Sequence, residues 1–147
     1  MSRALRNKIA ELSNRNHVEL KSEKIELNVV KDLEKASNII KRETSEANRV
    51  SSNMYNRRND VESAIGVIND LRSDFKSSNG KIANLGSALA DLEKLSNKLE
   101  SSAKELGIDP MEVKGVREVL KTQSNGIDTL KELKAEQKRT ESTLKKL

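Results

Sequence analysis

The sequence predicts an all-α protein in the form of an elongated coiled coil. Aromatic residues are nearly absent, with one Phe, one Tyr and no Trp among 147 residues, so the side chains that fill most globular cores are missing. Charged residues make up 35% of the chain, and there are only six Gly and one Pro, which permits long helices. The third observation is a long, regular heptad pattern.

The heptad pattern runs from Ala47 to Leu106. Fifteen of its eighteen a and d positions are apolar, although only 34% of the whole chain is apolar. The 3-4 spacing places these side chains on one stripe of a helix, which we call the seam. We expect the seam to contact other helices. Its main members are Met54, Val61, Ile68, Leu71, Phe75, Ile82, Leu85, Leu89, Leu92, Leu99 and Leu106.

Residues 1–16 predict a short N-terminal amphipathic helix, with Leu5, Ile9 and Leu12 on one face and Ser2 as its N-cap. Residues 17–106 then predict one long helix, whose apolar stripe begins at about residue 18. Its apolar residues follow an eleven-residue repeat over 18–47 and the heptad over 47–106. Uninterrupted from 18 to 106, this helix would span ~130 Å.

Two places could interrupt these helices. Residues 77–80 (Ser-Ser-Asn-Gly) have the composition of a turn, but the heptad register passes through them unshifted. We therefore expect the helix to continue, and we keep a break at 77–80 as the alternative. Residues 124–126 (Ser-Asn-Gly) raise the same question further along the chain.

A corner is predicted at residues 107–109. Gly107 suits the left-handed position after a helix, and Ile108 suits the hydrophobic contact that closes a Schellman motif. Asp109 suits the N-cap of the next helix, with Pro110 at its first position and Glu112 completing a capping-box-like pair. We expect the C-terminal helix, 110–147, to fold back on residues of about 70–106 as an antiparallel hairpin.

Three polar residues interrupt the seam: Arg57, Ser78 and Ser96. They are either tolerated beside solvent or, as buried polar residues can, fix the register or the oligomeric state. Tyr55 lies next to Met54 and is followed by Arg57 and Arg58, so this stretch has the highest concentration of residue types that favour contact with a partner. The alternative is that Tyr55 lies at an ordinary edge of the coiled coil.

The N-terminal half of the long helix needs a covering partner. The chain is rich in Ser and Asn, which are mediocre helix formers, so a projecting single helix would fray in water. We expect self-association as a parallel dimer or trimer, or packing against the helices of another protein.

Nothing in the sequence predicts catalysis. There is no Cys and only one His, His17, so His-based metal sets and Ser-His or Cys-His nucleophile pairs are not expected. Asp70 and Asp74 lie four residues apart and could share a cation, but that spacing is also common on a wetted helix face. We expect a non-enzymatic protein without a metal, cofactor or catalytic residue.

The net charge of +5 is spread evenly, which does not favour a nucleic-acid surface. No apolar run has the length of a membrane span or a signal peptide, so we expect no membrane partner and no export by a signal peptide. The expected location is the cytoplasm or a particle assembled inside the cell.

The leading functional hypothesis is a spacer, clamp or tether in a larger assembly, such as a virus particle or another macromolecular machine. One alternative is a basic helical module that binds nucleic acid, suggested by the pI of 9.4. Another is an export chaperone or adaptor. The basic pairs behind the nucleic-acid hypothesis are Lys41-Arg42, Arg57-Arg58, Lys138-Arg139 and Lys145-Lys146.

Overall fold

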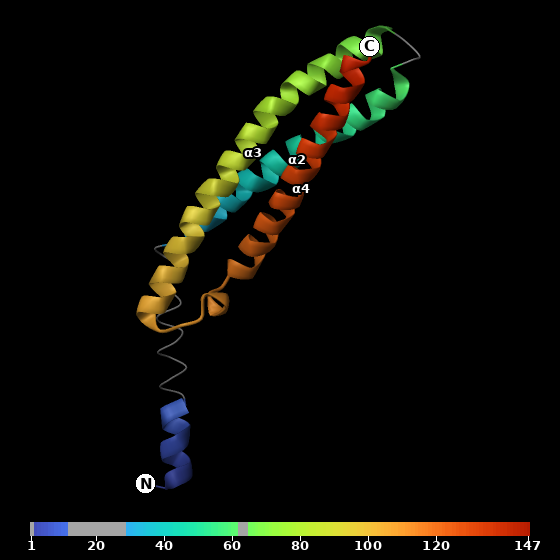
Figure 1. Cartoon of the computed structure of the whole chain (residues 1–147). Helices are drawn as coiled ribbons and strands as arrows, with labels where there is room; N and C mark the ends of the chain where they lie inside the picture. Colours follow the sequence, from blue (N-terminus) through green and yellow to red (C-terminus); the bar gives the residue numbers. More distant parts are fainter. Residues whose placement is uncertain (1, 12–28, 62–64) are drawn as a thin grey trace.

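Three long helices lie side by side in the computed structural model, which describes residues 2–11, 29–61 and 65–147 (Figure 1). They are α2 (Lys31–Asp60), α3 (Ile65–Leu106) and α4 (Val116–Lys145), and the 3₁₀ helix η2 (Pro110–Glu112) precedes α4. α2 and α4 run in the same direction, α3 runs opposite to both, and each of the three packs against the other two. No strand occurs in the described ranges, so the predicted all-α class is confirmed.

The chain reverses direction between α2 and α3, so the prediction of one continuous helix over 18–106 is wrong. α2 ends at Asp60, and α3 begins at Ile65 and returns along α2. The heptad pattern gave no sign of the reversal, because both helices place apolar residues at the same spacing toward one core. The heptad register also continues unshifted from α2 into α3. Residues 17–28 of the predicted helix lie outside the described ranges.

The polar run at 56–60 was the local signal for this reversal. Its five residues, Asn-Arg-Arg-Asn-Asp, contain no apolar side chain. Arg57 and Arg58 occupy the last turn of α2, where cations meet the negative end of the helix dipole, and Asp32 and Glu34 occupy the first turn. Both ends of α2 therefore carry the charges that suit helix termini.

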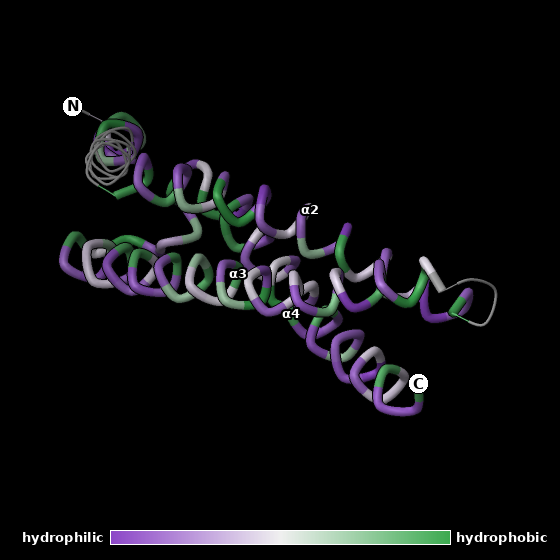
Figure 2. The backbone as a smooth tube through the Cα atoms, turned by 90° about the horizontal axis from the view of Figure 1, so that it is seen from above, coloured by the Kyte–Doolittle hydropathy of each residue, from purple (hydrophilic) through white to green (hydrophobic). Residues whose placement is uncertain are grey.

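The core lies along the middle of the bundle and draws on all three helices. Apolar residues recur at helical spacing, so hydrophobic and hydrophilic segments alternate along each helix in Figure 2. The largest fully buried apolar side chains are Leu33, Ile40, Val50 and Met54 of α2, Leu71, Leu85 and Leu92 of α3, Val116 and Leu133 of α4, and Val113 in the corner.

The predicted corner at residues 107–109 is confirmed. Gly107 has a φ of 71°, its N–H donates to the carbonyl of Lys104 (3.1 Å), and the N–H of Ile108 donates to the carbonyl of Ala103 (3.0 Å). These are the two hydrogen bonds of a Schellman motif. The Asp109 side chain then accepts a hydrogen bond from the N–H of Met111 (2.9 Å), as expected of an N-cap. α4 follows antiparallel to α3, so the predicted hairpin is also confirmed.

α4 begins six residues later than predicted, at Val116 instead of residue 110. The helical turn opened by Asp109 ends after Glu112, and Val113 is extended, with a ψ of 126°. Gly115 then takes a φ of 89°, a conformation that only glycine adopts without strain, and forms the N-cap of α4. The predicted helix is therefore split by Gly115.

Neither turn-like segment breaks its helix, since α3 runs through 77–80 and α4 runs through 124–126. Gly126 has a packing role instead. A Cβ atom built on it would lie 2.9 Å from Cγ2 of Ile40 and 3.1 Å from Cδ2 of Leu89. α4 therefore approaches α2 and α3 at a point where only a glycine fits.

Residues 3–11 are helical and fall within the predicted N-terminal helix 1–16; residues 12–16, including Leu12, lie outside the described ranges. Ser2 caps it as expected, because its Oγ accepts a hydrogen bond from the N–H of Leu5 (3.2 Å) and its carbonyl accepts one from the N–H of Arg6 (3.1 Å). Every residue of this helix is exposed, including Leu5 and Ile9 at 49% each.

We predict that Gly126→Ala destabilises the bundle by about 1–2 kcal/mol, because the clash with Ile40 and Leu89 outweighs the gain in helix propensity. Gly80 is the matched control: it is exposed in α3, and a Cβ there would have nothing within 4 Å. Gly80→Ala should stabilise by up to ~1 kcal/mol. Urea denaturation measures both changes, and equal effects would contradict the close contact at Gly126.

Candidate interaction surfaces

The seam residues, predicted as a surface for another chain, pack inside this one. Met54, Leu71, Leu85 and Leu92 are fully buried, and Leu89 and Leu99 are nearly so. The remaining members for which exposure is described, Val61, Ile68, Phe75, Ile82 and Leu106, are half-buried. Because the chain folds back on itself, α2 and α4 cover the seam of α3. The argument that the seam requires a second chain therefore no longer applies, and self-association needs a different surface.

A polar cluster at the α2–α3 connection end of the bundle joins all three helices. Arg57 of α2 forms an ion pair with Asp74 of α3, and Arg58 of α2 forms one with Glu136 of α4. Arg58 also donates to the hydroxyl of Thr140 (3.2 Å). The side chains of Arg58 and Glu136 are only 12% and 6% exposed, so the charge of Arg58 depends on the Glu136 carboxylate for compensation.

Ser78 completes this cluster between α3 and α4. It is fully buried, donates to the carbonyl of Phe75 (2.6 Å) and accepts from Nε2 of Gln137 (2.9 Å). Gln137 also donates to Oδ1 of Asn79 (2.6 Å). Of the three register candidates, Arg57 and Ser78 therefore contact neighbouring helices of the same chain, whereas Ser96 is half-buried in a groove described below.

The pKa of Glu136 reflects this environment. Burial raises the pKa, but hydrogen bonds and charges from Arg58 and Arg139 outweigh burial and hold the pKa below its ordinary value. Arg139 Nη1 lies 2.6 Å from Glu136 and 3.7 Å from Glu132. Glu136 thus stays ionised between two guanidinium groups.

A shallow polar groove of about 520 Å³ runs between α2 and α4 beside this cluster. Tyr55, the predicted contact residue, lies in it, is 54% exposed and has its ring 5.7 Å from the Arg58 guanidinium. The three charged residues that line the groove, Glu132, Glu136 and Arg139, form ion pairs with one another or with Arg58. The other lining residues are amides and hydroxyls, so the groove is polar and offers hydrogen-bonding groups. Its lining residues are Asn48, Ser51, Ser52, Tyr55, Asn56, Glu132, Glu136 and Arg139.

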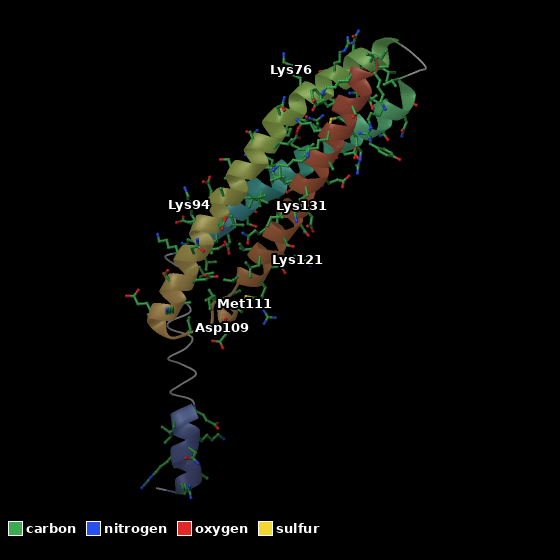
Figure 3. All side chains as sticks on the ribbon, viewed as in Figure 1. Lys76, Lys94, Asp109, Met111, Lys121 and Lys131 are labelled. Carbon is green, nitrogen blue, oxygen red and sulfur yellow. The ribbon has the colours of Figure 1, made fainter. Side chains whose placement is uncertain are left out.

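A second groove, which we call the corner groove, is apolar and measures about 260 Å³. It lies where η2 and the start of α4 meet α2 and α3, and Asp109 and Met111 mark its position in Figure 3. Ten residues line it: Leu33, Ser96, Leu99, Glu100, Asp109, Pro110, Met111, Val116, Val119 and Leu120.

The face that α4 buries is offset by one position from two of its heptad-spaced aliphatic residues. Leu120 and Ile127, seven residues apart, are 36% and 41% exposed. Val119 and Gly126, one position earlier in each case, are buried instead. The close approach at Gly126 turns α4 so that two aliphatic side chains face outward.

The two acidic candidates do not lie together in a cation site: Asp74 is paired with Arg57, and Asp70 is exposed. His17 lies outside the described ranges. Within the described ranges no group of three or more His, Cys, Asp or Glu side chains could hold a metal ion. None of the helices searched there is both long and apolar enough to span a bilayer.

We predict that Glu136→Gln destabilises the fold by about 3 kcal/mol, because it leaves the nearly buried Arg58 without a counter-charge. Glu141 is the matched control on α4, since its pair with Lys145 is solvent-exposed. Glu141→Gln should cost about 0.5 kcal/mol or less. Chemical denaturation at pH 7 measures both, and similar losses would show that the Arg58 pair contributes nothing beyond an ordinary surface contact.

Acid should destabilise the wild-type protein through the same residue. A carboxylate whose folded-state pKa is lowered contributes stability above its unfolded pKa, near the ordinary 4.5, and loses it as pH falls through the folded value. The stability difference between wild type and Glu136→Gln should therefore shrink below about pH 4.5. Denaturation midpoints measured from pH 7 to pH 3 test this, and a constant difference would refute it.

Comparisons with known proteins add no functional information. No protein-family model matches this chain, and neither the search of curated proteins nor that of solved structures returned a match. Any functional proposal therefore depends on the surfaces described above. Two of these surfaces bring exposed aliphatic side chains together: helix 3–11, with Leu5 and Ile9, and the corner groove, with Met111 and Leu120.

Proposed function

We propose that this chain is a non-enzymatic interaction protein that acts as a spacer, clamp or tether in a larger assembly. The observation that carries the proposal is the pairing of a well-packed bundle with exposed aliphatic side chains gathered in two places. Leu5 and Ile9 share one face of helix 3–11, and Met111 and Leu120 line the corner groove. Single exposed aliphatic residues are ordinary, whereas grouped ones mark contact sites.

The bundle suits a structural role because it is long and its helices are joined to one another by ion pairs and hydrogen bonds. α3 alone has 42 residues, which corresponds to about 63 Å at 1.5 Å per residue. The ion pairs of Arg57 and Arg58 and the hydrogen bond from Gln137 to Ser78 connect every pair of helices. Such a rod can hold two partners at a fixed separation.

The nucleic-acid alternative has less support. Phosphate binding requires cations that are available to the ligand. Arg57 and Arg58, one of the basic pairs, are instead paired with carboxylates of the same chain. An adaptor or export chaperone would use the same exposed apolar surfaces as a tether, so these two functions differ only in the partner.

Site-specific photocross-linking tests the proposal. A photoreactive amino acid at Leu5 or Met111, both exposed, should give protein adducts in cells that produce the chain at its native level. The matched control is Asn84, an exposed polar position of α3 outside both apolar surfaces, which should give none. Adducts to nucleic acid would favour the basic module, and equal labelling at all three positions would overturn the assignment of the contact surfaces.

A further inference from the structure

Helix 3–11 and the corner groove are complementary in shape and polarity. The helix presents Leu5 and Ile9 four residues apart on one face, the spacing by which an amphipathic helix anchors in a hydrophobic groove. The groove is about 260 Å³ and lined mainly by aliphatic side chains. This is below the usual size of a small-molecule pocket but suited to side chains of a docked helix.

The charges of the two surfaces are opposite. Helix 3–11 carries three cations, Arg3, Arg6 and Lys8, against one acid, Glu11. The corner groove has two acids among its lining residues, Glu100 and Asp109, and no basic residue. Cations on the helix would meet carboxylates at the groove while the apolar groups lose their contact with water.

We propose that helix 3–11 of one copy of this chain docks in the corner groove of a second copy. The chain leaves its own groove open in the structure, because every residue of helix 3–11 is exposed and Met111 and Leu120 of the groove remain exposed as well. A neighbouring copy can supply the missing helix. This inference rests on the proposed function as an interaction protein, and it names a second copy of the chain as the partner.

The contact is head-to-tail, because it joins two different surfaces. Each copy that donates a helix still has an empty groove, and each copy that accepts one still has a free helix. Such a heterologous contact continues into rings or open chains instead of stopping at a symmetric dimer. Self-association through the corner groove therefore differs from the parallel dimer or trimer expected from the seam.

The experiment uses two complementary variants of the full chain, followed by sedimentation velocity and light scattering over a range of concentrations. Leu5→Ala with Ile9→Ala removes the apolar face of the helix while keeping its helix propensity. Leu120→Lys places a cation in the groove at a partly exposed position, and Met111→Lys is a second groove variant. Ile39→Lys, at an exposed aliphatic residue of α2 outside the groove, is the control.

The wild type and Ile39→Lys should form species larger than dimers as concentration rises. Each helix or groove variant alone should associate at least about tenfold more weakly. An equimolar mixture of the helix variant and a groove variant should form one-to-one pairs and nothing larger, since one intact helix meets one intact groove. Circular dichroism confirms that each variant remains folded.

Three results would overturn the proposal. In the first, the wild type stays monomeric and Leu120→Lys speeds hydrogen exchange in residues 3–11. That result would mean that the helix docks in the groove of its own chain. Another is a monomer whose binding to anionic lipid vesicles depends on Leu5 and Ile9. The third is a mixture of variants that does not pair. In each case, protein adducts from cross-linking at Leu5 would leave the broader function standing with a different partner.

Discussion

Two adjacent arginines at the end of α2 hold the three helices in register. Consecutive residues on an α-helix point about 100° apart, so Arg57 and Arg58 are directed toward different neighbours. Arg57 pairs with Asp74 of α3 and Arg58 with Glu136 of α4. Because a nearly buried charge without a partner is costly, an arrangement that separates either pair is disfavoured. The pairs thus select one packing from those that a repetitive heptad pattern would allow.

Hydrophobic burial supplies the driving force for this packing but little of its specificity. Leu, Ile and Val at heptad spacing fit equally well against a second chain or against a folded-back segment of the same chain. The short connection between α2 and α3 makes the intramolecular contact available without bringing two molecules together. The seam is consequently satisfied within one chain, and α3 is covered by α2 and α4.

The surface left for partners follows from the same packing. Gly126 allows α4 to approach Ile40 and Leu89 closely, and this turns Leu120 and Ile127 toward solvent. At the corner, the extended Val113 and the left-handed Gly115 delay the start of α4, and the corner groove opens beside η2. The apolar contact surface is thus a consequence of how the core is packed.

The sequence by itself determined the helical class, the Ser2 cap, the corner at Gly107 to Asp109 and the antiparallel pair that the corner produces. These depend on local chemistry: helical periodicity, a glycine in left-handed geometry, and side chains that cap the neighbouring backbone. Periodicity and capping act within about one turn, so a single sequence is enough to identify them.

Only the tertiary structure decided where α2 ends, which partner covers the seam and which face α4 buries. The heptad register carries no information about chain reversal, because two antiparallel helices and one long helix can share the same pattern. The ion pair of Arg58 with Glu136 joins residues 78 positions apart, and the contact of Gly126 with Ile40 likewise joins distant parts of the chain. Such contacts follow from the packing of whole helices, which no local pattern encodes.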